Sequence, residues 1–502
     1  MNSIKKYRYE IIIFWINAVG MILELIASRV LSPYFGSSNI IWTSIIGIIL
    51  LSGSIGNYLG GKIADKDGRE DNLKLIFLMS SIFIFMIPLF QEDVLRFIVK
   101  MTSNIKIGAI LATSILFLIP SIFIGIVTPI LLKLKLNSLE NAGKTAGNLY
   151  AISTLGAIIG TFLGGFLLIP NIGSVYILYI LTVAVLILPI FVDGKIKNKF
   201  TIVYVLISIF ILSIMFLKIR DNNDKGRRVL AGEVGIKVSY DTQYGRVIIY
   251  NVDTKEGDKL RVLNIDSGYE SIGYANEEKA YDIYSKYIGY YDLMFKANPD
   301  IKRVAMIGGA GYSYPKHYIS NNEDTIMDVI EIDGDITEIA KKYFYLDKLI
   351  DEYDLKNNKR LRLITEDGRV FFNTTNNKYD AILNDAFSGN TPAKTLTTLE
   401  AIQNIKRCLN NNGYYLTNII SSVDGENSKF LKAEVNTLKK VFKNVYVIPC
   451  IDDISSADCY NNMVIATDDE VRFDNSYNIE LSEKEIVLTD DYCPIDTLIP
   501  VI

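Results

Sequence analysis

The sequence predicts an α-helical multi-span membrane domain followed by an α/β domain that begins with a small antiparallel β-sheet. Three observations predict this. Hydrophobic residues form 50% of the 502-residue chain, and the longest apolar runs lie before residue 220. Residues 1–220 carry a net charge of +9, whereas residues 221–502 carry −13. Finally, residues 303–335 have the pattern of a strand, a glycine turn, a helix and a second strand, which begins a nucleotide-binding parallel sheet.

Seven apolar runs reach or approach the roughly 20 residues that a helix needs to cross a bilayer. The first run is not followed by a small-residue cleavage site, so we interpret it as a span rather than a removed signal. Glycines recur at intervals of about four residues in several runs, which favours close helix packing in lipid. The runs are residues 11–27, 40–59, 75–89, 107–132, 146–169, 175–192 and 202–217.

The basic residues of the first half lie in the loops between these runs, which indicates membrane topology and argues against nucleic acid as a partner. Thirteen Lys and Arg lie at the amino terminus and after the second, fourth and sixth runs, against four in the opposite loops. With seven spans, this asymmetry predicts a multi-pass protein of the cell membrane whose acidic domain lies outside. The chemistry that motifs of the acidic domain imply favours the cytoplasm for this domain instead, so both sides of the membrane stay open for it.

A polar stretch at residues 221–228 separates the two halves of the chain. After it, residues 237–251 and 259–265 alternate apolar and polar side chains, which predicts two or three antiparallel strands. We therefore divide the chain into a membrane domain at 1–220, a linker with a small β domain at 221–275, and an α/β domain at 276–502.

The four cysteines lack the spacing of a metal site, and we expect no metal. Cys450 and Cys459 flank a loop between two strand-like runs, so the sequence allows a disulfide between them in an oxidising compartment. Free thiols, including those of Cys408 and Cys493, are the default expectation.

The glycine turn is the first candidate site. An apolar run at residues 304–307 ends in Gly308, Gly309 and Gly311, and Glu331 ends the next strand about 20 residues later. Glycines let the backbone approach a ligand closely, and the carboxylate is placed to accept hydrogen bonds from ribose hydroxyls. The pattern favours a nucleoside site over an ordinary turn.

Two further strand-like runs also end in acids. Residues 361–365 run into Asp367 and Gly368, and residues 379–383 run into Asp385. Ligands bind at the carboxyl ends of the strands in open α/β sheets, so these acids are expected at one edge. The fold class predicted is α/β Rossmann-like, of the class I methyltransferase type.

With this order of motifs, residues 240–420 resemble the spermidine synthase (polyamine aminopropyltransferase) family. The layout of spans and domain, with LTDDYCPIDTL at residues 488–498, looks like the family's membrane-fused branch. The resemblance implies a membrane-bound transferase that moves the aminopropyl group of decarboxylated S-adenosylmethionine to a putrescine-type amine and releases methylthioadenosine. It implies no permanently bound cofactor, and its partners would be the two small molecules and the lipid bilayer. A monomer and a homodimer both stay open.

The resemblance also implies roles for individual residues. The glycine turn would hold the nucleoside, Glu331 the ribose, and Asp367 with Gly368 the adenine. An amine whose pKa lies above about 10 is a cation at neutral pH, so a carboxylate must orient it and accept a proton. Asp385 matches that proton acceptor. The predicted site residues are Gly308, Gly309, Gly311, Glu331, Asp333, Asp367, Gly368, Asp385, Ser388, Pro392, Tyr244 and Tyr284.

Departures from the family pattern concern the amine half of the site. Gly311 and Ser388 stand where soluble members carry acids, Ser285 follows Tyr284 in place of a histidine, and Gly245 follows Tyr244 in place of a glutamine. One alternative is therefore an S-adenosylmethionine-dependent methyltransferase or another nucleoside-binding enzyme. Another is a polyamine transporter or sensor, because Glu24 lies well inside the first apolar run.

Overall fold

The computed structural model forms two compact units. One comprises Met1–Val229 with Ser239–Arg246, and the other Leu230–Val238 with Val247–Ile502. We call them the helical unit and the α/β unit. The residues that the structure describes are 7–35, 39–67, 70–102, 104–136, 142–192, 199–225, 238–266, 268–388, 391–451 and 458–499.

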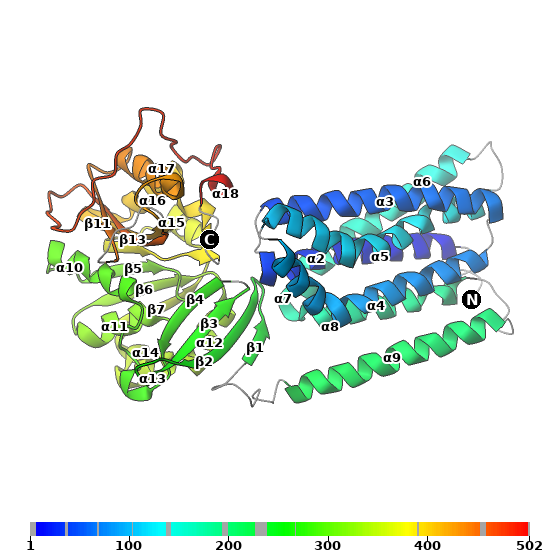
Figure 1. Ribbon diagram of the computed structural model, residues 1–502, viewed down its shortest axis with the longest axis horizontal. Coiled ribbons are helices and arrows are strands. Elements are labelled where there is room, and N and C mark those ends of the chain that lie inside the picture. Colours follow the sequence, from blue (N-terminus) through cyan, green and yellow to red (C-terminus); the bar gives the residue numbers. More distant parts are fainter. Residues whose placement is uncertain are drawn as a thin grey trace. The chain divides into compact units, whose positions relative to one another are not determined.

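Long helices form the helical unit (Figure 1), as the apolar runs predict. Among the described residues, six helices are long and apolar enough to cross a membrane, and the seventh predicted span lies in a helix whose apolar part, Ile202–Leu217, is shorter. This last helix continues to Lys225, so the polar stretch predicted as a linker begins inside a helix. The helices are α2 (Arg8–Phe35), α3 (Asn39–Asp67), α4 (Glu70–Met101), α5 (Ile105–Lys135), α6 (Ala142–Phe162), α7 (Ile169–Asn171), α8 (Ser174–Leu186) and α9 (Lys199–Lys225).

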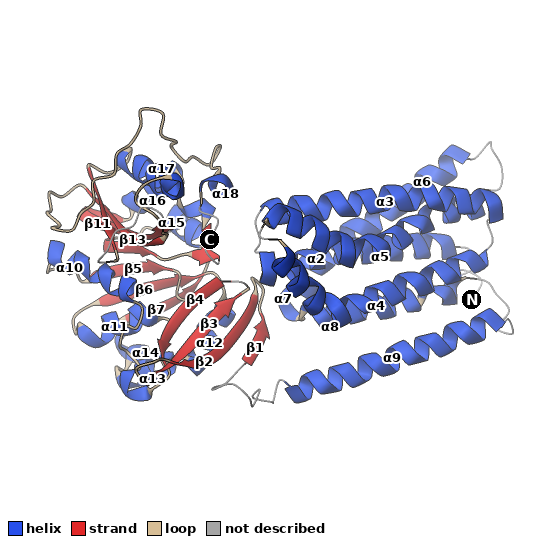
Figure 2. Cartoon of the chain, in the orientation of Figure 1, coloured by secondary structure: helices blue, strands red, loops and turns tan. Residues whose placement is uncertain are grey.

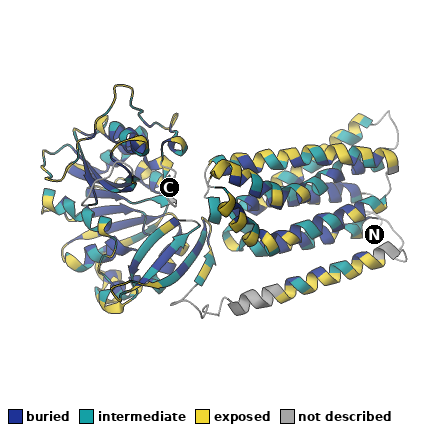
Figure 3. Ribbon diagram, in the orientation of Figure 1, coloured by how far each residue is buried: buried dark blue, intermediate teal, exposed yellow. Residues whose placement is uncertain are grey.

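Glycines allow these helices to pack closely, as their spacing predicts. A Cβ on Gly56 of α3 would lie 2.5 Å from the carbonyl oxygen of Ile122 in α5. Gly156 and Gly160 of α6 meet the backbone of α2 in the same way. Large apolar side chains point outward instead, for example Phe166, which is 76% exposed, and exposed positions recur along the helices (Figure 3). Such an outer surface suits contact with lipid tails.

A four-stranded sheet follows the long helices, in the order β1-β2-β3-β4 (Figure 2). Most of β1 and the turn into β2 belong to the range of the helical unit, and the rest of the sheet belongs to the α/β unit. The pairs β2–β3 and β3–β4 are antiparallel. The sequence predicted two or three strands and missed β4, whose sequence GYESIGY contains two glycines and does not alternate cleanly. The strands are β1 (Val238–Asp241), β2 (Arg246–Asp253), β3 (Lys259–Ile265) and β4 (Gly268–Tyr274).

The larger sheet has seven strands in the order β12-β13-β11-β8-β5-β6-β7, and its five strands from β11 to β7 are parallel. β13 runs antiparallel to both β11 and β12. This order confirms the Rossmann-like, methyltransferase-type fold. The strands are β5 (Arg303–Ile307), β6 (Ile326–Glu331), β7 (Leu361–Thr365), β8 (Tyr379–Asn384), β11 (Leu409–Ser421), β12 (Asn444–Pro449) and β13 (Tyr460–Thr467).

Helices flank this sheet, and a two-stranded hairpin follows β8. Residues 277–295 carry tyrosines near a helical spacing, a sequence pattern that predicts one helix with an aromatic face of mostly core residues. They instead form two 3₁₀ turns and the start of α10. The helices and hairpin strands are α10 (Leu293–Ala297), α11 (Ser313–Asn321), α12 (Gly334–Tyr343), α13 (Leu346–Glu352), α14 (Leu355–Asn358), α15 (Gly368–Thr374), β9 (Phe387–Ser388), β10 (Thr391–Pro392), α16 (Leu399–Arg407), α17 (Lys429–Lys439) and α18 (Ile495–Leu498).

A buried carboxylate ties neighbouring strands of the large sheet together. Asp328 of β6 is fully buried and accepts hydrogen bonds from Arg362 Nε at 2.7 Å and Nη2 at 2.6 Å. The hydroxyl of Tyr379 in β8 donates to the same carboxylate at 2.7 Å. An ionised acid can be buried at this position because these donors replace its water.

All four cysteines are free thiols, so no disulfide joins Cys450 to Cys459. Cys450 is buried, whereas Cys459 is partly exposed.

Candidate active site

The candidate site lies at the carboxyl ends of β5 and β8, which are adjacent in the sheet. From β5 the chain continues to β6 and β7 on one side and then returns to β8 on the other, which makes this the topological switch point where α/β sheets bind ligands. The N–H of Asp385 donates to the carbonyl of Ile307 at 3.0 Å. Gly308 has a φ of +88°, and a Cβ there would lie 2.6 Å from the carbonyl oxygen of Asp385. The glycine turn and the Asp385 loop are therefore in direct backbone contact, which only glycine permits.

Glu331 supports the glycine turn from the end of β6. Its Oε2 accepts hydrogen bonds from the N–H groups of Gly309 at 2.7 Å and Ala310 at 3.2 Å, and its Oε1 accepts one from Asp333 at 3.0 Å. Burial raises the pKa of Glu331, and the three backbone bonds oppose this rise. The carboxylate that was predicted to hold ribose thus also fixes the shape of the turn.

The two remaining glycines of the turn are required by their neighbours. A Cβ on Gly309 would lie 2.6 Å from the ring of Tyr312. A Cβ on Gly311 would collide with the hydroxyl of Ser271 in β4. An acid at position 311, as in soluble family members, would not fit here without movement of β4. This gives a physical reason for the departure at Gly311.

Asp333 and Asp367 each cap a helix at the same edge of the sheet. Asp333 is buried and accepts from the N–H of Asp335, while Asp367 accepts from the N–H of Val370 at 3.1 Å. Gly368 packs on Ile307, since a Cβ there would lie 2.6 Å from a side-chain carbon of that residue.

Two apolar side chains are exposed beside these acids. Ile332, directly after Glu331, is 38% exposed, and Val370 near Asp367 is 48% exposed. Apolar surface next to polar acceptors is what a flat aromatic base requires.

Asp385 sits at the end of β8 and is held by two side chains from distant parts of the chain. Asn418 Nδ2 in β11 donates to its Oδ1 at 3.1 Å, and the hydroxyl of Tyr287 donates to its Oδ2 at 3.2 Å. Burial raises the pKa of Asp385 above its ordinary value, and the hydrogen bonds from Asn418 and Tyr287 oppose that rise. Burial, and then the same carboxylate, raise the pKa of the Tyr287 hydroxyl. Asp385 is therefore oriented and has increased affinity for a proton.

A cavity of about 360 Å³ opens beside this carboxylate. Asn418 lines it and is only 3% exposed, and its Oδ1 has no hydrogen-bond partner among the residues that the structure describes. Because a carboxylate only accepts, the amide nitrogen of Asn418 must face Asp385, which leaves the amide oxygen to accept from a ligand. We call this cavity the Asp385 pocket. Its other lining residues include Glu270, Ser285, Lys286, Tyr287, Ile420, Cys450 and Tyr460.

Several predicted residues are not among the described residues that line this pocket. Tyr284 is 40% exposed and packs edge-on against Tyr274, while Tyr244 lies in the turn between β1 and β2 and is 46% exposed. Pro392 pairs with Phe387 in the β9–β10 hairpin. Ser388 belongs to the same hairpin, and its side chain lies outside the described residues.

Sequence reasoning missed Tyr287 and Asn418. Tyr287 was grouped with an aromatic face of core residues, and the turn of 3₁₀ helix that directs it toward Asp385 has no clear sequence signal. Asn418 gave a weak signal, since a polar residue within the apolar strand β11 needs a partner.

This fold and site define an α/β domain of the class I methyltransferase type, with a glycine turn and strand-end acids suited to a nucleoside. Residues 281–475 match the sequence model of the spermine/spermidine synthase domain. This part of the α/β unit is therefore similar to the spermine/spermidine synthase domain.

Individual proteins show the same relationship. A polyamine aminopropyltransferase from Vibrio vulnificus is 32% identical over 152 residues, which are 30% of this chain and 46% of that protein. One from Methanocaldococcus jannaschii is 29% identical over 201 residues, 40% of this chain and 62% of that protein. The chain thus spans about half the length of the first relative and under two thirds of the second. A crystal structure of a probable spermidine synthase from Corynebacterium glutamicum covers 47% of this chain and 82% of its own, with 18% identity and a TM-score of 0.40.

Proposed function

We propose that this protein is a multi-pass membrane polyamine aminopropyltransferase. It would transfer the aminopropyl group of decarboxylated S-adenosylmethionine to a putrescine-type amine. The observation that carries the proposal is the Asp385 carboxylate, held by Tyr287 and Asn418 beside an open pocket in a domain that matches the model of the spermine/spermidine synthase domain. The six long apolar helices support residence in a membrane.

Donor and amine would occupy two adjoining parts of the site. The glycine turn, Glu331 and Asp367 are suited to the adenosine half of the donor, because hydroxyl and amine groups of a nucleoside donate to carboxylates. The amine would enter the Asp385 pocket, where Asp385 and Glu270 supply negative charge and Lys286 is the one cation among the described lining residues. Negative charge there would offset the repulsion between a cationic amine and a cationic sulfonium.

In the proposed step, Asp385 first accepts a proton from the ammonium form of the substrate. The freed nitrogen lone pair then forms a bond to the methylene carbon next to the sulfonium. The carbon–sulfur bond breaks, and its electron pair stays on sulfur, which becomes the neutral thioether of methylthioadenosine. The raised pKa of Asp385 suits proton acceptance, since a stronger base takes the proton more readily.

The experiment uses the purified full chain with the decarboxylated donor and a panel of amines, and mass spectrometry detects methylthioadenosine. We expect product with at least one diamine, and a rate lowered by about a hundredfold or more in Asp385→Asn, which cannot accept the proton. Asp380→Asn is the matched control, because Asp380 lies at the other end of β8 and accepts hydrogen bonds from the N–H groups of Lys302 and Arg303 and from Asn410.

The carboxylated donor, S-adenosylmethionine, tests the alternative. A methyltransferase would release S-adenosylhomocysteine from it. That product, together with no methylthioadenosine from any amine, would refute the proposed function.

A further inference from the structure

The C-terminal segment at residues 488–498, which we call the strap, is docked onto the α/β unit next to the predicted donor site. Leu488 and Ile495 are buried in the core, and so is Cys493. The N–H of Leu399, at the start of α16, donates to the carbonyl of Leu488 at 2.8 Å. The buried side chains and this backbone bond hold the strap in place.

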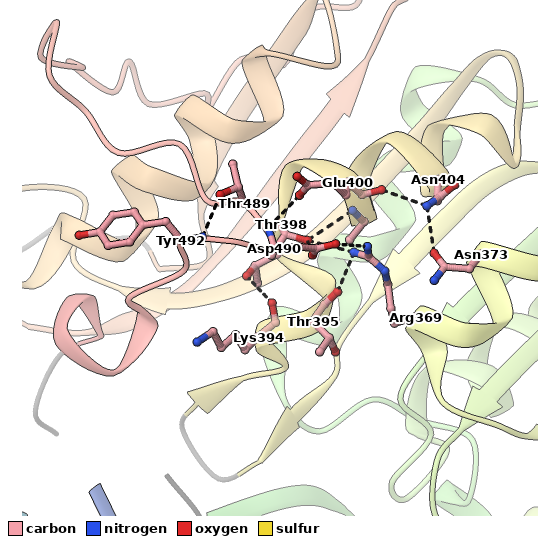
Figure 4. Close-up of polar contacts among 12 residues, drawn as sticks. Arg369, Asn373, Lys394, Thr395, Thr398, Glu400, Asn404, Thr489, Asp490 and Tyr492 are labelled. Carbon is pink, nitrogen blue, oxygen red and sulfur yellow. Dashed lines mark hydrogen bonds and ion pairs between the residues drawn. The ribbon is translucent and has the colours of Figure 1, made fainter. Parts of the chain in front are cut away.

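One side chain of the strap, Asp490, joins two separate segments (Figure 4). Its Oδ1 accepts from the hydroxyl of Thr398 at 2.6 Å, and its Oδ2 accepts from Arg369 Nη2 at 2.7 Å. Arg369 Nη1 closes the ring by donating to Thr398 Oγ1 at 2.9 Å and to the carbonyl of Thr395 at 3.2 Å. The backbone N–H of Asp490 also donates to Glu400 at 2.9 Å.

Each of the two joined segments follows, along the chain, residues that were predicted to form the site. Arg369 directly follows Asp367 and Gly368, which were predicted to hold adenine. Thr395 and Thr398 end the connection that leads from Asp385 into α16, and Thr398 caps that helix. The Asp490 carboxylate thus fixes the adenine side of the site relative to the chain that leaves the proton acceptor.

The contacts of the Asp490 carboxylate contribute little to the stability of the fold. The Asp490 side chain is 51% exposed, and a half-exposed ion pair contributes only about 0–1 kcal/mol to stability. Leu488, Cys493 and Ile495 keep the strap docked without it. Loss of the carboxylate should therefore change the relative position of the two segments more than the stability of the fold.

Resting on the proposed function, we propose that Asp490 is a positioning residue: through Arg369 and Thr398 it keeps the donor site preformed. Asp490→Asn keeps the size of the side chain and removes its charge. We expect the KM for decarboxylated S-adenosylmethionine to rise by about fivefold, the factor that a loss of about 1 kcal/mol gives, with little change in kcat or in the KM for the amine.

Three further variants sharpen the test. Asp491→Asn is the matched control, because it makes the same change at the adjacent, exposed position. Asp490→Glu, which keeps the charge, should recover part of the donor affinity. If Asp490 acts through Arg369, the effects of Asp490→Asn and Arg369→Gln should not add. The double variant should then have a donor KM no higher than that of the single variant with the higher donor KM.

A loss of kcat with an unchanged donor KM would overturn the proposal, and so would additive effects in the double variant. Hydrogen exchange of residues 393–400 separates this inference from the proposed function, because it requires neither turnover nor ligand. We expect faster exchange there in Asp490→Asn than in Asp491→Asn. Equal exchange in the two variants would refute the role of Asp490 even if the protein turned over no amine.

Discussion

Replacing Tyr287 with phenylalanine should make Asp385 easier to protonate. The Tyr287 hydroxyl donates to the carboxylate at 3.2 Å, and this bond opposes the burial that raises the pKa of Asp385. A hydrogen bond to a charged group is worth about 1.5–3 kcal/mol. Because 3.2 Å is long for a hydroxyl donor, we take the lower limit, which corresponds to a rise of about one pH unit in the pKa.

The assay is the pH dependence of kcat/KM for methylthioadenosine release, with the same amine for wild type and variant so that titration of the amine cancels. A base must be ionised to accept a proton, so activity falls as the pH drops through the pKa of Asp385. Since Tyr287→Phe raises that pKa, the acidic limb should move to higher pH by about one unit. Tyr284→Phe, which removes a hydroxyl three residues away and outside the pocket, should leave the limb in place. An unmoved limb in Tyr287→Phe, or one moved to lower pH, would refute the assignment of Asp385 as the base.

Three other predictions follow from contacts described above. Glu331→Ala should weaken donor binding by about tenfold or more, because the N–H groups of Gly309 and Ala310 in the turn, and that of Asp333, lose their acceptor, and calorimetric titration with methylthioadenosine measures this. Asp328→Asn should destabilise the α/β unit by about 2–3 kcal/mol, which is less than for a fully buried pair because Arg362 is 43% exposed. Scanning calorimetry of the full chain should show a lower melting temperature for Asp328→Asn than for Asp347→Asn, which changes an exposed position and serves as the control. For orientation, a cysteine introduced at Asp224 in a chain without native cysteines should react with a membrane-impermeant reagent in intact cells if seven spans put the α/β unit outside, and protection would refute that assignment.

The fold could be predicted largely from strand ends. The apolar runs of β5, β6 and β8 stop abruptly, and for β6 and β8 the residue at or just after the stop is Glu331 or Asp385. The rule that ligands bind at the carboxyl ends of parallel strands therefore placed these acids at one edge of the sheet. The resemblance then supplied their roles. Strand β4 was missed because its glycines interrupt the pattern.

The side chains that hold Asp385 could not be predicted in the same way. Tyr287 and Asn418 come from a 3₁₀ turn and from β11, and their contact depends on the exact path of the chain between elements. An α-helical repeat would place Tyr284 and Tyr287 on one face, but the observed turn directs only Tyr287 to the carboxylate. Local backbone geometry, rather than residue type, decided which tyrosine reached the site.

The division of the site between different strands has a consequence for how its specificity can change. The glycine turn and Glu331 are built on β5 and β6, whereas most of the Asp385 pocket is built from β4, β11, β13 and the 3₁₀ turn. Ile420 and Cys450 line the pocket without touching the turn's hydrogen bonds. Descendants of an ancestral enzyme could therefore exchange one acceptor for another through such positions while inheriting the donor machinery intact. Directed evolution toward a new acceptor should accordingly begin at these two side chains.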